Sequence, residues 1–204
     1  MKKFTLFFLL LTSVLFAERP FDDPPQQESL RPNFILARGE HFILGMSPDG
    51  VIELENECQF KAADGYAYAL QYWDLNDRVT FTPNNHFFGG SEFYMVNLTK
   101  NESLKVNLWR GPNLDNPRTS RLLKVDELRE EIVLSNSDGV KSRWKIQRDD
   151  FSKIQEWWKL GASVIVGKNN GGFVSRWFSS DTHVLVCYRA KRHNLYVHAT
   201  PIPL

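Results

Sequence analysis

The 204-residue sequence lacks the short motifs that mark several enzyme classes. It contains no G-x-S-x-G pentapeptide, the turn that exposes the nucleophilic serine of α/β-hydrolases. The glycine pairs Gly89-Gly90 and Gly171-Gly172 lack the Lys-Ser/Thr, or the following helix, that a phosphate-binding loop needs. These absences exclude a nucleophile elbow and a nucleotide-binding loop of the known sequence types, and no cofactor is expected.

Long hydrophobic runs are missing after the N-terminus. The one such run, Phe4–Phe16, follows Lys2-Lys3 and is shorter than the roughly 20 residues that cross a bilayer as a helix. Ala17 and Glu18 come directly after it. This order of basic, apolar and small residues predicts a secretory signal peptide over residues 1–17, with an uncleaved anchor as the alternative. The predicted location is therefore periplasmic or secreted.

Charge of one sign is not in excess either. The chain has 25 Lys and Arg against 24 Asp and Glu, and removal of Lys2 and Lys3 with the signal peptide leaves 23 against 24, a net charge of −1. Nucleic-acid-binding domains usually carry a clear basic excess, and attraction to anionic lipid needs one too. The balance argues against a nucleic-acid partner.

Cysteine is scarce, with only Cys58 and Cys187 in the chain. Because an exported protein enters an oxidising compartment, a disulfide between them is one interpretation, and it would join the two halves of the chain. Two buried thiols are the other interpretation. The sequence leaves both open.

What the sequence does contain is a repeat. The segment Trp73–Asn85, WDLNDRVTFTPNN, returns without a gap as Trp158–Asn170, WKLGASVIVGKNN, and an aromatic residue precedes the tryptophan in both copies. Such a recurrence indicates one structural unit used twice. The tryptophans lead into alternating, strand-like residues, so we expect both Trp73 and Trp158 in a core.

Short alternating runs, turn signals and a helical pattern before each tryptophan predict an all-β fold with one short helix per unit. The architecture expected is a tandem duplication of a small β-barrel or compact β-sandwich. The predicted organisation is a Pro-rich leader over 18–33, a first β unit over 34–109, a linker over 110–121 and a second β unit over 122–204. The leader is interpreted as a solvated spacer, with a partner-binding arm as the alternative. Because small sheets need their edges covered, the units are expected to pack together.

The spacing W-x-L-x-[DA]-x-V-x-[FV]-x-x-N occurs at Trp73–Asn84 and again at Trp158–Asn169. It resembles a pattern of uncharacterised exported tandem-domain proteins of obligate intracellular bacteria. The resemblance implies a duplicated, exported β module and no known activity.

Two glycine-containing loops carry the candidate ligand or partner surface. They follow the repeat in each unit and are rich in aromatic side chains, which together with one arginine make an effective contact surface. The alternative is that these side chains fill a barrel mouth or the contact between units. The residues are Phe87, Phe88, Phe173, Arg176, Trp177 and Phe178.

Three histidines near the C-terminus are the candidate metal or catalytic residues. His183 and His198 are expected to face each other across an antiparallel pair, and His193 lies near the hairpin tip. Three imidazoles can bind zinc, although the spacing is wider than in most zinc sites, so ordinary histidines are the alternative. The neighbouring acids Asp149-Asp150 are interpreted as solvated, since adjacent residues of a strand point to opposite faces.

These observations favour an exported, non-enzymatic binding or structural protein of the bacterial envelope or secreted space. Its partner would be a protein or envelope component held through the aromatic loops. The competing hypothesis is a hydrolase or metal-dependent enzyme that uses the C-terminal histidines.

Overall fold

The computed structural model describes residues 36–84, 90–169, 183–188 and 195–204, and the structural statements below concern these ranges. Within them the chain forms twelve β-strands, one 3₁₀ helix and one α-helix. The described residues belong to one compact unit that begins at Leu36. No helix among them is both long enough and apolar enough to cross a membrane.

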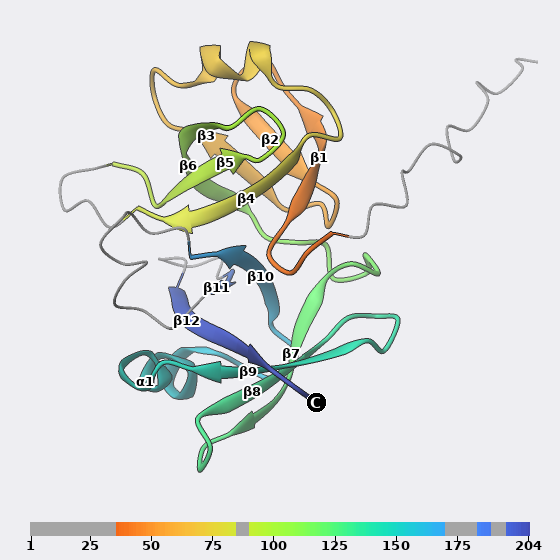
Figure 1. Cartoon of the computed structure of the whole chain (residues 1–204), viewed down its shortest axis with the longest axis vertical. Coiled ribbons are helices and arrows are strands. Elements are labelled where there is room, and N and C mark those ends of the chain that lie inside the picture. The colour runs from red at the N-terminus through yellow and green to blue at the C-terminus, as the bar shows by residue number, and fades with distance from the viewer. Residues whose placement is uncertain (1–35, 85–89, 170–182, 189–194) are drawn as a thin grey trace, which may run out of the picture. The chain divides into compact units, whose positions relative to one another are not determined.

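The first barrel is closed by six antiparallel strands in the order β1-β2-β3-β6-β5-β4 (Figure 1). A 3₁₀ helix, η1 (Ala67–Tyr72), connects β3 to β4 and ends directly before Trp73. The strands are β1 (His41–Met46), β2 (Val51–Leu54), β3 (Gln59–Ala62), β4 (Arg78–Pro83), β5 (Phe93–Asn97) and β6 (Glu102–Arg110).

The second barrel has the same strand order, β7-β8-β9-β12-β11-β10. Its helix α1 (Arg148–Trp157) lies at the same point of the chain path and ends directly before Trp158. The strands are β7 (Ser120–Asp126), β8 (Glu131–Ser135), β9 (Lys141–Ile146), β10 (Ser163–Lys168), β11 (His183–Cys187) and β12 (Leu195–Ile202). The prediction of duplicated small β-barrels with one short helix each is confirmed.

The two barrels also agree in local hydrogen bonding, which fixes the equivalent residues. Asn76 N donates to Ile43 O at 2.8 Å, and Gly161 N donates to Leu122 O at the same distance. The pairing of β1 with β2 shifts register between Ile43 and Gly45, and the pairing of β7 with β8 shifts in the same way between Leu122 and Lys124. Ile43 therefore corresponds to Leu122, and the residues on either side of them in β1 and β7 correspond in the same order.

Each barrel buries the alternate side chains of its strands. The first core is rich in phenylalanine, with Phe60, Phe81 and Phe93 packed ring against ring at centroid distances of 5.3 to 6.1 Å. Trp73 is 3% exposed and Trp158 is 7% exposed. The expectation that both repeat tryptophans belong to the core is confirmed.

Strands β10 and β11 are buried on both faces, and this joins the barrels. In β10, Val164 packs into the core of the second barrel, whereas Ile165 packs into the core of the first. In β11, Val184 and Val186 also pack into the first core, while Leu185 packs into the second. Burial on two faces explains why these strands read as nearly continuous apolar runs. The two units pack together, as expected.

The backbones of the two barrels approach closely at Gly167 of β10. A Cβ atom at Gly167 would lie 2.5 Å from the carbonyl oxygen of Phe81, a separation that real side chains do not adopt. Beside this point Thr80 Oγ1 donates to Gly39 O at 2.6 Å, and Lys168 N donates to Thr80 Oγ1 at 3.1 Å. The glycine is required here because β4 and β10 meet with no room for a side chain.

The segment between the barrels is slightly shorter than the linker predicted over 110–121. Strand β6 extends to Arg110, and strand β7 begins at Ser120. The connection therefore comprises residues 111–119, and the second barrel begins two residues before Leu122, where the sequence placed it.

Candidate functional site

The predicted aromatic surface lies outside the residues that the structure describes. This holds for Phe87, Phe88, Phe173, Arg176, Trp177 and Phe178, and also for His193. Their proposed roles therefore stay predictions from the sequence.

The expectation that His183 and His198 face each other is wrong. Strands β11 and β12 pair His183 with Ala199 and Val184 with His198. A register that differs by one residue turns a side chain to the opposite face of a sheet. The ring of His183 consequently packs against Trp144 at 5.1 Å, whereas the ring of His198 packs against Tyr196 at 5.6 Å.

These two histidines thus do not converge on one metal ion. Burial lowers the pKa of His183, whose Nε2 lies 3.2 Å from the carbonyl oxygen of Arg38. Within the described ranges no group of three or more His, Cys, Asp or Glu side chains is placed to hold a metal ion.

Asp150 is buried, although the sequence interpretation placed it in solvent. It lies in the first turn of α1 and is 6% exposed. Its Oδ2 accepts hydrogen bonds from the backbone N and the Nδ1 of His198, both at 2.8 Å, and Lys153 contacts its Oδ1. Burial alone would raise the pKa of Asp150, but the bonds from His198 and Lys153 hold it well below its usual range. Asp149 is exposed, as expected.

A second buried acid, Glu55, is paired with His41 at the contact between the barrels. Nδ1 of His41 lies 2.8 Å from Glu55 Oε1, and Nε2 lies 2.8 Å from the carbonyl oxygen of Val166 in β10. Both ring nitrogens therefore face acceptors, an arrangement that suits an imidazolium donating on both sides. Glu55 Oε2 also accepts from the backbone N of Phe42 at 3.2 Å.

The electrostatics of this pair agree with its geometry. Burial alone would lower the pKa of His41 and raise that of Glu55. Their mutual attraction and hydrogen bond outweigh burial, so the pKa of His41 lies above its ordinary value and that of Glu55 lies below. Both shifts favour the charged form of each group, and the pair ties the first barrel to the backbone of the second.

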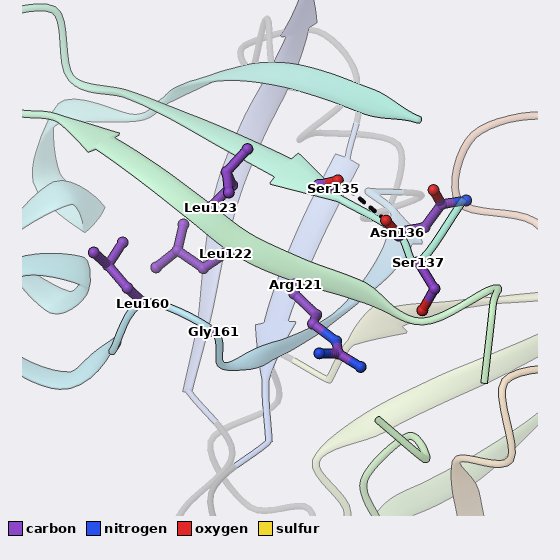
Figure 2. Close-up of a pocket in the computed structure, with 8 residues that line it drawn as sticks. All are labelled: Arg121, Leu122, Leu123, Ser135, Asn136, Ser137, Leu160 and Gly161. Atoms are coloured by element: carbon purple, nitrogen blue, oxygen red, sulfur yellow. Dashed lines mark hydrogen bonds between the residues drawn. The ribbon is translucent and has the colours of Figure 1, made fainter. Parts of the chain in front are cut away.

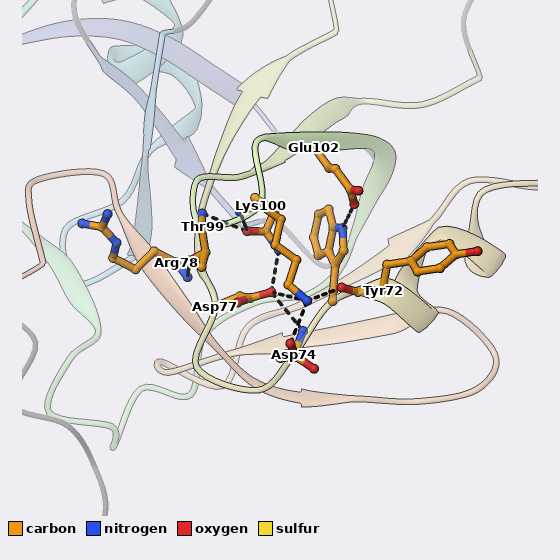
Figure 3. Close-up of polar contacts among 9 residues, drawn as sticks. Tyr72, Asp74, Asp77, Arg78, Thr99, Lys100 and Glu102 are labelled. Carbon is orange, nitrogen blue, oxygen red and sulfur yellow. Dashed lines mark hydrogen bonds and ion pairs between the residues drawn. The ribbon is translucent and has the colours of Figure 1, made fainter.

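The loop after η1 is held by a polar cluster (Figure 3). Asp77 Oδ2 accepts from Asp74 N at 2.9 Å and from Asn97 Nδ2 at 2.7 Å, and Lys100 Nζ lies 2.7 Å from Asp74 Oδ2. The second barrel has Ala162 at the position of Asp77. The cluster therefore stabilises one loop of one barrel and is not a repeated functional feature.

The cysteines are buried thiols rather than a disulfide. Cys58 packs in the first core and Cys187 packs in the second. Burial, followed by the nearby carboxylate of Glu55, raises the pKa of Cys58 well above its ordinary value. A thiol with a raised pKa is a poor nucleophile at neutral pH.

A pocket of about 430 Å³ opens on the second barrel where β7 begins and β8 ends. Figure 2 shows leucine side chains toward one end, serine and asparagine toward the other, and Arg121 between them. The apolar residues are Leu122, Leu123 and Leu160, and the polar ones are Ser135, Asn136 and Ser137. Leu123 and Leu160 are 49% and 68% exposed, so the apolar end is open to solvent.

The corresponding place on the first barrel is covered by the connecting segment. Asn113 N donates to Asn56 O at 3.1 Å, and Asn113 Nδ2 donates to Glu57 Oε2 at 2.8 Å. Asn116 Nδ2 donates to Glu55 O at 3.1 Å and to Glu57 Oε1 at 3.0 Å. The same corner of the fold is thus occupied by polypeptide in one barrel and open in the other.

Sequence reasoning did not find this pocket, although the repeat held part of the signal. Once the copies are aligned, Asn56 and Asn136 fall at the same hairpin tip. Asn56 Oδ1 accepts from Cys58 N, and Asn136 Oδ1 accepts from Val140 N. Its openness in the second unit depends on where residues 111–119 lie, which no local pattern records.

No family model, no curated protein and no solved structure matches this chain.

Proposed function

We propose that the chain is a non-enzymatic binding protein of a bacterial envelope or secreted space and that its second barrel holds the partner. One observation carries the proposal: the corner that the first barrel fills with residues 113–116 is an open pocket in the second barrel. Concave sites with an apolar wall and a few convergent polar groups are typical of binding sites. Export rests on the basic and apolar N-terminal sequence, Lys2–Phe16.

The surface around the pocket supports a macromolecular partner. Leu123 and Leu160 are exposed beside it, and exposed apolar side chains beside polar ones favour contact with another protein or an envelope component. The aromatic loops, represented by Trp177 and Phe178, remain part of this proposal as a second contact region.

A crosslinking pull-down from native cells tests the proposal. The wild-type chain is compared with the double variant Leu123→Ser/Leu160→Ser. The matched control is Leu44→Ser/Leu75→Ser, which changes the equivalent exposed residues of the first barrel. We expect the second-barrel variant to lose the captured partner and the control to keep it.

Equal capture by all three proteins would contradict the role of the second barrel. A Trp177→Ala/Phe178→Ala variant, assayed beside them, tests the aromatic loops separately. Circular dichroism of each protein confirms that a loss of capture does not come from unfolding.

A hydrolase that uses His198 is the second candidate function. The observation in its favour is that the carboxylate of Asp150 binds Nδ1 of His198, which orients the ring as a general base requires. The test is hydrolysis of a panel of activated esters by the wild type and by His198→Gln. Activity that disappears in His198→Gln supports this candidate, and equal rates reject it.

A further inference from the structure

We propose that the second-barrel pocket binds an acidic segment of a partner polypeptide, in the position that residues 113–118 take on the first barrel. This inference rests on the proposed binding function and adds the chemical class of the ligand. It follows from three comparisons between equivalent positions of the two barrels.

The first comparison concerns the occupant of the first barrel. It is a short stretch of chain whose amide groups donate to the Glu55–Glu57 tip, through Asn113 and Asn116. The same stretch places the guanidinium of Arg118 over the ring of Phe42, 4.9 Å from its centre. The first-barrel corner is thus acidic and aromatic, and it is filled by amide hydrogen-bond donors and by the guanidinium of Arg118.

The second comparison concerns the side chains of the corner itself. In the second barrel Ser135 and Ser137 stand in place of Glu55 and Glu57, and Arg121 stands in place of Phe42. The carboxylate that residues 113–116 contact on the first barrel, that of Glu57, is thus replaced by the hydroxyl of Ser137, and a cation is now part of the site. The occupant that suits the second-barrel corner therefore carries hydrogen-bond acceptors and negative charge rather than donors and positive charge. Complementary charge decides which partner an interface accepts.

The third comparison concerns the hydrogen-bond partners of the Arg121 guanidinium. One of its Nη atoms donates to the carbonyl oxygen of Leu114, while its Nε is buried and has no partner among the described residues. No carboxylate in the described ranges lies within ion-pair distance of it. A guanidinium recognises carboxylates through paired donors, so an acidic side chain supplies what this group lacks.

The size and surroundings of the pocket favour a peptide over a small anion. A volume of about 430 Å³ far exceeds what one carboxylate fills, and the exposed Leu123 and Leu160 offer contact to an apolar neighbour of the acidic residue. The first barrel shows that polypeptide fits this corner, since the backbone N of Asn113 bonds to the tip there.

Selection of displayed random heptapeptides on the immobilised full chain tests the inference. We expect at least tenfold enrichment of peptides containing Asp or Glu on the wild type and loss of this enrichment on Arg121→Gln. Arg121→Lys keeps the charge and should retain part of the preference, and Arg121→Glu should shift it toward Lys and Arg. The matched control is Arg148→Gln, which removes an exposed arginine elsewhere in the second barrel.

The outcomes separate this inference from the proposed function. If selected peptides depend on Leu123 and Leu160 but show no acidic preference, the binding function stands and the acidic ligand is rejected. If acidic peptides bind Arg121→Gln and wild type alike, the role of Arg121 is rejected. If no peptide depends on either feature, both proposals fail. Equal melting temperatures of the Arg121 variants and the wild type exclude unfolding as the cause of lost binding.

Discussion

The two barrels share one chain path but differ in the polar chemistry of the same corner. In the first barrel, His41 and Glu55 form a buried ion pair, and residues 111–119 cover the adjoining hairpin tip. In the second barrel, the equivalents are Ser120 and Ser135, and the tip is open. Both barrels keep the same buried core positions although this corner differs between them. The core therefore holds the fold in each barrel, and the corner is the part that is available to a ligand.

The largest effect is expected at the ion pair that only the first barrel has. Glu55→Gln removes the charge that compensates the buried His41, and breaking a buried pair in this way costs about 3 kcal/mol of the free energy of unfolding. The equivalent change in the second barrel, Ser135→Ala, should cost less than about 1 kcal/mol because it removes one neutral hydrogen bond. Urea unfolding followed by tryptophan fluorescence measures both. Similar costs at the two positions would show that the pair does not stabilise the first barrel specifically.

The next effect is expected where β4 and β10 meet. Gly167 corresponds to Thr82 of the first barrel. At Gly167, however, Phe81 leaves no room for even a methyl group. Gly167→Ala should therefore destabilise the protein by about 1–3 kcal/mol, the usual cost of overpacking. Thermal unfolding by calorimetry measures the change.

Gly45→Ala is the matched control for this contact. Gly45 also lies in a strand, but a Cβ atom there meets only Glu53 Cβ at an ordinary 3.8 Å. Replacing it should leave stability unchanged or slightly raised, because alanine loses less backbone entropy than glycine on folding. If both variants melt alike, the contact between the barrels is looser than the structure shows.

The ion pair also predicts a difference in pH dependence. Because the pKa of His41 is raised in the folded state, its protonated form stabilises the fold. This contribution is fully present below pH 6.5 and is lost as pH rises through the folded-state pKa. The lowered pKa of Glu55 stabilises the fold above pH 4.5 and is lost as pH falls through its folded-state value. The pair therefore contributes most to the free energy of unfolding between pH 4.5 and 6.5.

The double variant His41→Ser/Glu55→Ser installs the residues of the second barrel and isolates this effect. All other titratable groups, including the neighbouring Glu40, are common to both proteins. The difference between their unfolding free energies should narrow above pH 6.5 and below pH 4.5. A difference that stays constant from pH 4 to pH 9 would contradict an ionised pair.

Much of the fold could be predicted because both copies of the repeat carry the same local sequence pattern. The repeat that begins at Trp73 and Trp158 marks a buried tryptophan followed by a strand, and both features depend on residues close in sequence. Strands β10 and β11 are buried on two faces, and the apolar runs Ser163–Val166 and His183–Cys187 are typical of such strands. The linker predicted over 110–121 differs from the observed connection, residues 111–119, by at most two residues at either end.

The side-chain pairings could not be predicted, because they depend on register and on distant segments. A shift of one residue between β11 and β12 separates His183 from His198. Asp150 lies in the helix that the sequence predicted before Trp158, but its burial comes from contact with β12, which is distant in sequence. The pocket beside Arg121 arises from the path of residues 111–119, which composition alone marks only as a linker.

The smallest effect distinguishes the two tryptophans of the repeat. Trp73 Nε1 donates to Glu102 Oε2 at 3.0 Å, whereas Trp158 Nε1 is buried without a partner among the described residues. Substitution by phenylalanine removes similar volume at both positions, but it breaks a hydrogen bond only at Trp73. At Trp158 it removes an unsatisfied donor, whose burial is unfavourable.

Trp73→Phe should therefore cost about 1 kcal/mol more than Trp158→Phe in urea unfolding. Glu102→Gln serves as the control, since it keeps an acceptor for Trp73 and should change stability by only a few tenths of a kcal/mol at this exposed position. If Trp158→Phe proves the more costly change, the indole N–H of Trp158 has a partner that the described residues do not supply. The two copies of the repeat would then differ less in their polar contacts than the cores of the two barrels suggest.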